Sequence, residues 1–140
     1  MSQYKVGRAG EYLAAYYLSQ HFDEIFEPNP IARYDFLVMK HDIPYKIQVK
    51  TSESIFKHRN KDMVRWDTKK RVNKIKKMYR EDEVDLFAFV YLPLDKVEFV
   101  ANRNMTATWQ KSLPYIKDVN TRKSLEKSIF VINALKENDI

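Results

Sequence analysis

The sequence predicts an α/β (α+β) fold in which a mixed central β-sheet is flanked by helices. Residues 7–22 and 120–135 place apolar side chains at helical spacing, and most of the chain between them consists of short runs typical of strands. The chain has 140 residues, of which 44% are hydrophobic and only 2 are Gly. We therefore expect one domain over residues 1–140, with a core at about 5–102 and a helical region at 103–140.

The first helix is predicted over residues 7–22. Val6, Leu13 and Tyr17 form an apolar stripe, and small residues such as Gly10 would let the helix backbone approach a sheet closely. Glu11 lies at this point of the helix. A glutamate on a helix is ordinarily solvated. If this helix approaches the sheet closely, however, the carboxylate of Glu11 would also lie near the sheet.

A β-hairpin is predicted over residues 34–52. Its two extended runs, 34–39 and 45–51, flank a polar turn around His41 and Asp42. A short strand at residues 25–27 precedes the hairpin, and a Pro-Asn-Pro segment separates the two.

The second strand of this hairpin carries an unusual set of polar residues. Because strand side chains alternate, Ile47 and Val49 face one way, and Gln48 and Lys50 face the other. In a suitable register Asp35 would lie beside this polar pair. A carboxylate, an amide and an ammonium would then share one patch.

The later elements follow from the same patterns. In chain order we expect a connection at 53–60, a strand at 63–67, a helix at 69–80, strands at 86–91 and 97–100, and a weakly helical stretch at 105–113. The helix at 69–80 rests on helical spacing of Val72, Ile75 and Met78, with Thr68 as its cap. The strand at 86–91 is apolar throughout, which favours a central position.

Composition excludes several classes of protein. The chain contains no Cys, so disulfides, thiolate metal sites and cysteine nucleophiles are excluded. There is no apolar run of about 18 residues and no signal-peptide pattern, so we expect a soluble, cytoplasmic protein that does not enter a membrane. Any metal must be bound by oxygen ligands or by the three His residues.

Positive charge is concentrated in one segment, residues 57–80. It holds eleven Lys and Arg against two acids, Asp62 and Asp67, which gives +9 locally in a chain whose net charge is +6. Such a segment repels itself unless a polyanion supplies the counter-charge, which favours nucleic acid as a partner. An ordinary solvated surface and another acidic partner are the alternatives.

Three stretches, GRAGEYLAAYYL, YDFLV and IQVKTS, resemble the active-site segments of the PD-(D/E)XK nuclease superfamily. They are similar to archaeal Holliday-junction resolvases and, more closely, to a subgroup that includes a bacterial group I intron-encoded homing enzyme and has Gln where most relatives have an acid. The later YREDEVDLFAFVYLPLDKVEFV also looks like this subgroup, so the resemblance covers residues 7–102. It implies a restriction-endonuclease-like core.

The resemblance implies a catalytic site made of Glu11, Asp35, Gln48 and Lys50. Phosphodiester hydrolysis by such a site uses Mg²⁺ (or Mn²⁺), for which Asp35 is the first-choice ligand, joined by Gln48 and the carbonyl of Val49. Glu11 would complete the site by a direct or water-mediated contact with the metal or by holding Lys50. Gln48 offers a neutral oxygen in place of a carboxylate. Lys50 is suited to orient or deprotonate the attacking water and to stabilise charge on the phosphate.

We expect double-stranded DNA to bind the segment that follows this site. The residues expected to contact it are Thr51, Ser52, Lys57, His58, Arg59, Lys61, Arg65, Lys69, Lys70, Arg71 and Lys74. Cutting both strands is most simply arranged by a homo-oligomer, a dimer or a tetramer, with one site for each strand. The function expected is therefore site-specific DNA cleavage of the homing type. Two alternatives remain, a Holliday-junction resolvase and a catalytically inactive DNA-binding module.

Overall fold

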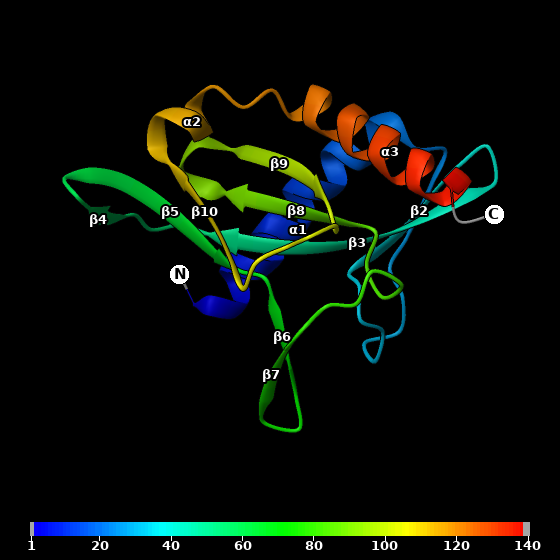
Figure 1. Cartoon of the computed structure of the whole chain (residues 1–140), viewed down its shortest axis with the longest axis horizontal. Helices are drawn as coiled ribbons and strands as arrows, with labels where there is room; N and C mark the ends of the chain where they lie inside the picture. The colour runs from blue at the N-terminus through cyan, green and yellow to red at the C-terminus, as the bar shows by residue number, and fades with distance from the viewer. Residues whose placement is uncertain (1, 139–140) are drawn as a thin grey trace.

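Five strands form the central sheet of the protein, in the order β1-β2-β3-β8-β9 (Figure 1). The computed structural model describes residues 2–138. The strands are β1 (Glu24–Phe26), β2 (Phe36–Lys40), β3 (Ile43–Ser52), β8 (Leu86–Tyr91) and β9 (Lys96–Ala101). Strands β3 and β8 run parallel and the other neighbours antiparallel. The predicted mixed sheet with flanking helices is confirmed, and the expected hairpin is β2–β3.

Two helices, α1 (Gln3–His21) and α3 (Thr121–Asn138), cover one face of this sheet. The core between them includes Leu18 of α1, Ile47 of β3 and Ile132 of α3, all fully buried. Neither helix, nor any other within residues 2–138, is long and apolar enough to cross a bilayer.

The opposite face is covered by a second sheet of three strands, β10-β5-β4. The elements on this side are β4 (Phe56–His58), β5 (Lys61–Asp67), β10 (Thr108–Ser112) and the short helix α2 (Leu113–Lys117), and a 3-10 turn, η1 (Leu92–Leu94), joins β8 to β9. Rings of Phe87, Phe89 and Trp109 stack in series in this second core, with centroids 5.5 and 5.3 Å apart. Trp66 is fixed by an N–H that donates to the Val90 carbonyl at 2.9 Å.

The helix predicted over residues 69–80 is wrong, because this segment forms a two-stranded hairpin, β6 (Lys69–Val72) and β7 (Ile75–Met78). Asn73 and Lys74 make its turn, with φ of 49° and 68°. A helix would place the seven cations of residues 69–80 close together along three turns. The hairpin instead extends away from the main body (Figure 1), where charges separate into solvent. We call it the β6–β7 ribbon.

Two smaller predictions also fail. Residues 105–113 were expected to be helical, but they contain β10, whose Trp109 pairs with Trp66 of β5. The region 103–140 is therefore helical only in part. The connection expected at 53–60 contains β4, which pairs with β5. β10 pairs with a strand that is distant in the sequence, and β4 pairs with the next strand along the chain. The spacing of apolar residues within each segment does not reveal either pairing.

Helix α1 approaches β3 closely at Gly10, as its small residues predict. A Cβ built on Gly10 would lie 1.8 Å from Oγ1 and 2.8 Å from Cβ of Thr51, whereas one on Gly7 would have no neighbour within 4 Å. Only a residue without a side chain fits here. This contact fixes the height of α1 over the sheet and so the position of Glu11.

The outer edge of β9 is covered by hydroxyl groups of α3. The N–H of Phe99 donates to Ser124 at 3.0 Å, the Phe99 carbonyl accepts from Ser128 at 2.8 Å, and the Val97 carbonyl accepts from Thr121 at 2.6 Å. These side chains satisfy backbone groups that an edge strand would otherwise leave open.

We predict that Gly10→Ala lowers the free energy of unfolding by about 1–3 kcal/mol, because the added methyl group overlaps Thr51 and must push α1 from β3. Gly7→Ala is the matched control, and it should raise stability by about 0.5–1 kcal/mol through helix propensity alone. Urea unfolding followed by circular dichroism measures both. Equal stability of the two variants would contradict the close approach.

Candidate active site

Asp35 lies immediately before β2 and is fixed by β3 at two points. Its N–H donates to the Ile47 carbonyl at 2.8 Å, and its Oδ2 accepts from the N–H of Val49 at 2.8 Å. The pairing of Phe36 with Ile47 places Asp35 opposite Gln48, so the two side chains lie on the same face. The register required for the predicted polar patch is therefore present.

Glu11 reaches this patch from α1. Its carboxyl is close enough to act on Asp35 both as a charge and as a hydrogen-bonding group. Glu11 Oε2 also accepts from Nη1 of Arg8 at 2.7 Å, and the same nitrogen lies 3.1 Å from Glu27. One carboxylate oxygen of Glu11 is thus held by Arg8, its neighbour one turn away on α1.

Burial is the main cause that raises the pKa of Asp35 to about 6, and the neighbouring Glu11 acts in the same direction. The N–H of Val49 and the ammonium of Lys50 oppose the shift but do not cancel it. Two carboxyl groups close together in a partly desolvated place are unfavourable as a pair of anions. A cation between them would remove that cost.

Lys50 lies on the same face of β3 as Gln48. Its Nζ donates to the Lys69 carbonyl at 3.0 Å, at the base of the β6–β7 ribbon, and lies 5.0 Å from the ring centre of Tyr79. Burial lowers the pKa of Lys50, while the carboxylates of Asp67 and Asp35 favour the charged form. The ammonium is therefore held in a partly desolvated setting, close enough to Asp35 to feel its charge.

The remaining oxygen donors come from β3. The amide Nε2 of Gln48 lies 3.4 Å from the Val49 carbonyl, so the amide sits beside the backbone oxygen that was predicted as a ligand. Within residues 2–138 no group of three or more His, Asp or Glu gathers in a form that could hold a metal. Two carboxylates, an amide and a carbonyl nevertheless fit Mg²⁺, which takes few protein ligands and keeps waters or substrate phosphate as the rest.

A surface pocket of about 300 Å³ opens next to this site. Arg8, Glu11 and Asp35 line it together with the loop between β1 and β2, which contributes Pro28 and Tyr34. The two carboxyl groups are thus reachable from solvent. A phosphodiester entering here would meet the cationic Arg8 as well as the carboxylates.

The other two predicted residues on β3, Thr51 and Ser52, occupy different surroundings. Thr51 faces α1 and packs against Gly10, on the side of the strand opposite Gln48 and Lys50. Ser52 donates to the Ser54 carbonyl at 3.3 Å. Thr51 is therefore engaged in helix packing rather than turned toward the carboxyl pair.

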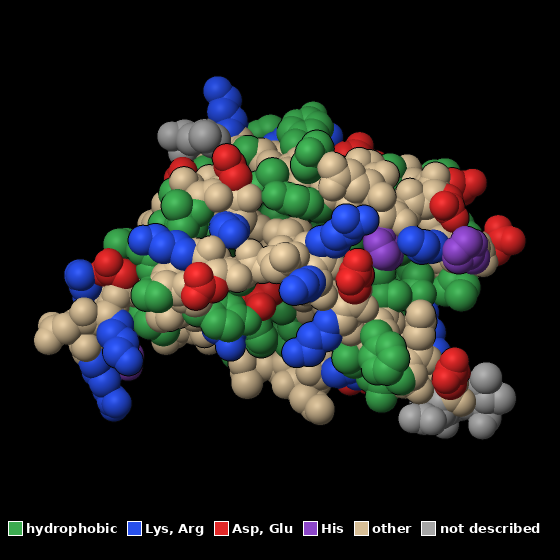
Figure 2. All heavy atoms as spheres, turned by 90° about the horizontal axis from the view of Figure 1, so that it is seen from above, with side chains coloured by type: hydrophobic (Ala, Val, Ile, Leu, Met, Phe, Trp, Pro, Cys, Tyr) green, Lys and Arg blue, Asp and Glu red, His purple; other side chains and the backbone are tan. Residues whose placement is uncertain are grey.

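The basic side chains of the β4–β5 hairpin are exposed. His58 and Arg59 lie at its tip, next to Lys61. Figure 2 shows Lys and Arg gathered at the left end of the molecule, where Figure 1 places this hairpin, and charges of both signs intermixed over the rest of that face. Lys57 pairs with Asp62 at 2.6 Å, and the guanidinium of Arg65 lies 4.4 Å from the ring centre of Phe56.

The β6–β7 ribbon divides its cations into two groups. Arg71, Lys74 and Lys77 are exposed and enter none of the ion pairs found among residues 2–138, and Lys69 is half-buried at the base. Lys70 instead turns inward to the buried carboxylate of Glu83. The positive surface of the ribbon therefore comes from its turn and its outer side chains.

Sequence reasoning missed three residues around the site, Arg8, Tyr79 and Glu83. Burial raises the pKa of Tyr79 and the charges of Asp35 and Glu83 add to the effect, so the phenol stays neutral. Glu83 accepts from the N–H of Arg80 at 3.0 Å and holds Lys70. Of the three, only Arg8 could have been found from the sequence. It stands three residues before Glu11 on a predicted helix, a spacing at which an ion pair is expected.

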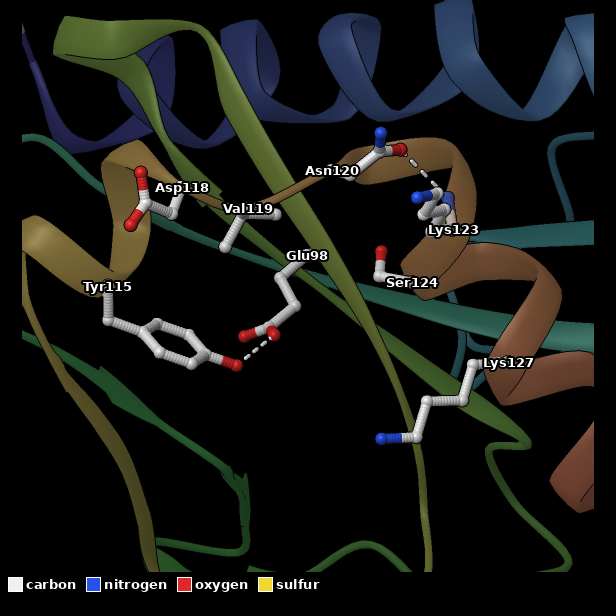
Figure 3. A pocket seen from close by; sticks show the side chains of 8 residues that line it. All are labelled: Glu98, Tyr115, Asp118, Val119, Asn120, Lys123, Ser124 and Lys127. Atoms are coloured by element: carbon white, nitrogen blue, oxygen red, sulfur yellow. Dashed lines mark hydrogen bonds between the residues drawn. The ribbon is translucent and has the colours of Figure 1, made fainter.

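A second pocket, of about 330 Å³, lies at the opposite edge of the sheet, between β9, α2 and the start of α3. Figure 3 shows the hydroxyl of Tyr115 directed at Glu98, to which it donates a hydrogen bond, and Asp118 pointing away from that pair. Its one central carboxylate is already bonded, and β9 is separated from β2 by two strands. The carboxyl pair at Asp35 is therefore the better candidate site.

Comparisons with known proteins identify the fold. No family model matches the sequence, and no match was found among curated proteins. Three chains of solved structures match, and one of them is described as a bacterial homing endonuclease, I-Ssp6803I. The match has 14% sequence identity and a TM-score of 0.68, and it covers 100% of this chain and 99% of that chain. The two proteins thus share their fold over the whole length.

We predict that Asp35 makes the protein less stable as pH rises in EDTA. Its pKa is about 6 when folded against an ordinary value of 3.8, so the native state binds the proton more tightly, and ionisation between these values costs about 2–3 kcal/mol of unfolding free energy. Asp35→Asn should remove this loss and be the more stable form at pH 7. Urea unfolding at pH 4 and pH 7 measures the difference, and parallel pH profiles of the two proteins would refute it.

Proposed function

We propose, from this fold and the site it carries, that the chain is a metal-dependent, site-specific DNA endonuclease of the homing type with a PD-(D/E)XK active site. The observation that supports this most is the meeting of Glu11, Asp35 and Lys50, which come from a helix, a strand start and a neighbouring strand. Burial alone disfavours such a group of charges. If the site binds a metal cation and a phosphate, the two carboxylates gain the cation as a partner and Lys50 gains the phosphate.

Each residue has a separate task in the proposed reaction. Asp35 and Glu11, with the Val49 carbonyl and the Gln48 amide, would hold Mg²⁺ or Mn²⁺, which when bound polarises the phosphate and lowers the pKa of a water. The N–H of Val49 keeps Asp35 in place for this. Lys50 orients the attacking water or takes its proton, and its charge stabilises the phosphate as negative charge develops.

The DNA would contact both the β6–β7 ribbon and the β4–β5 hairpin. Two-stranded ribbons fit the major groove of B-DNA, and Arg71 offers two donors that suit guanine. The tip of the β4–β5 hairpin, with Arg59 and Lys61, would contact the same duplex through its phosphates. The protein is proposed to act as a dimer or tetramer, because one site cuts one strand. Light scattering that finds only monomer with and without DNA would overturn this assembly.

We expect the protein to cut members of a library of duplex DNA with a randomised cassette when Mg²⁺ or Mn²⁺ is present, and to cut none in EDTA. Asp35→Asn and Lys50→Met keep the shape of each side chain but remove its charge, so cleavage should fall by about 10²–10⁴-fold while DNA binding remains. Sequencing of the cut ends measures both site and rate. Binding without cleavage by the parent chain would favour the non-catalytic module.

A junction resolvase is the second candidate, because it would use the same residues on a branched substrate. Competition between a four-way junction and a linear duplex containing the selected site separates the two. Preferential cleavage of the junction would identify a resolvase. Preference for the linear site supports the homing type.

We predict that Arg71→Ala, Lys74→Ala and Lys77→Ala each weaken binding to a duplex of random sequence and each reduce the slope of log affinity against log salt by about 0.9, since each removes a phosphate contact. Lys123→Ala on α3 is the matched control, since Lys123 is exposed on the opposite side of the sheet. Fluorescence anisotropy over a range of salt concentrations measures the slopes. If Lys123→Ala lowers the affinity and the salt slope by the same amount, the ribbon is not the DNA-binding surface.

A further inference from the structure

Tyr79 lies where the β6–β7 ribbon returns to the body of the protein. It follows Met78, the last residue of β7, and only 9% of it is exposed. Its ring meets Phe87 of β8 edge-on, with centroids 5.6 Å apart and an angle of 78° between the planes. Phe87 belongs to the stacked aromatic series of the second core. The ring therefore packs on the central sheet at the residue that directly follows the ribbon.

Two ammonium groups lie on this ring. Nζ of Lys50 is 5.0 Å and Nζ of Lys70 is 5.4 Å from its centre. Lys70 has the carboxylate of Glu83 as a partner, whereas no ion pair among residues 2–138 includes Lys50, which donates only to the Lys69 carbonyl. The π-face of Tyr79 is thus one of two groups that hold the Lys50 ammonium in place.

Both groups that hold Lys50 belong to the ribbon or to its base. Lys69 is the first residue of β6, and Tyr79 follows β7. Asp67, the last residue of β5, contacts both strands of the ribbon, since it accepts from the N–H of Lys69 at 2.9 Å and from Nζ of Lys76 at 3.0 Å. A shift of the ribbon would therefore move the contacts that fix Lys50.

We propose that Tyr79 is a positioning residue, whose ring holds the Lys50 ammonium beside Asp35 and so couples the placement of the DNA-binding ribbon to the reacting centre. The proposal rests on the proposed nuclease function for its effect on catalysis, but the contact itself is independent of it. An aromatic ring at this position is required, and its hydroxyl group is not. A change in the position of the ribbon when it contacts DNA would then change the position of Lys50.

Tyr79→Phe and Tyr79→Leu separate the ring from the hydroxyl group. With the duplex selected from the randomised library at saturating concentration, Tyr79→Leu should cut about 10-fold or more slowly than the parent chain and Tyr79→Phe within about 3-fold. Affinity for a random-sequence duplex in EDTA should change by less than about 2-fold in both, since neither loses a charge. Equal cleavage rates of the Phe and Leu variants would overturn the proposal.

Nuclear magnetic resonance of the DNA-free protein tests the contact without any activity. A lysine side chain over an aromatic ring has its ε-methylene protons shifted upfield, and Lys50→Met assigns the Lys50 signal by its disappearance. We expect the upfield shift in the parent chain and in Tyr79→Phe, and its loss in Tyr79→Leu. An unshifted Lys50 signal in the parent chain refutes the proposal, whether or not Tyr79→Leu folds. If the upfield shift is present but the parent chain does not cut DNA, the contact between Lys50 and Tyr79 stands and only the proposed nuclease function is contradicted.

Discussion

The hydrogen bond from the N–H of Val49 to the carboxylate of Asp35 is the interaction on which the site depends. It continues the β2–β3 ladder by one step, with a side chain in place of a carbonyl. It fixes the register of the hairpin at its open end, and it directs the carboxylate to the face that carries Gln48 and Lys50. A slip by one residue would turn Gln48 and Lys50 into the apolar layer under α1 and move Ile47 and Val49 to the face of the carboxyl pair.

Much of the fold was predictable because its strands and long helices follow simple rules. β8 has the same bounds as the apolar run that predicted it, residues 86–91, and the β2–β3 hairpin follows from alternation around a polar turn. Alternation along the second strand of the hairpin predicted that Gln48 and Lys50 share a face beside Asp35, and small residues around Gly10 indicated that the helix carrying Glu11 approaches the sheet. These signals are local, so they can be read without tertiary structure.

The β6–β7 ribbon could not be read in this way. Val72 and Ile75 are three apart, which fits a helix face, but in the hairpin they are cross-strand partners on either side of a two-residue turn. Asn73 and Lys74 adopt positive φ without a glycine, so the usual hairpin signal is absent. Glu83 and Tyr79 were missed for a related reason, because their roles come from Lys70 and Lys50 in other segments.

The hydroxyl groups that α3 places along β9 limit how copies of this chain can join. Extension of the central sheet from one molecule into another needs a strand with free N–H and carbonyl groups at the shared edge. At β9 the groups of Phe99 and the carbonyl of Val97 are already bonded within the chain. A continuous sheet across two molecules would first have to displace a packed helix, so any assembly that uses this side must join through side chains.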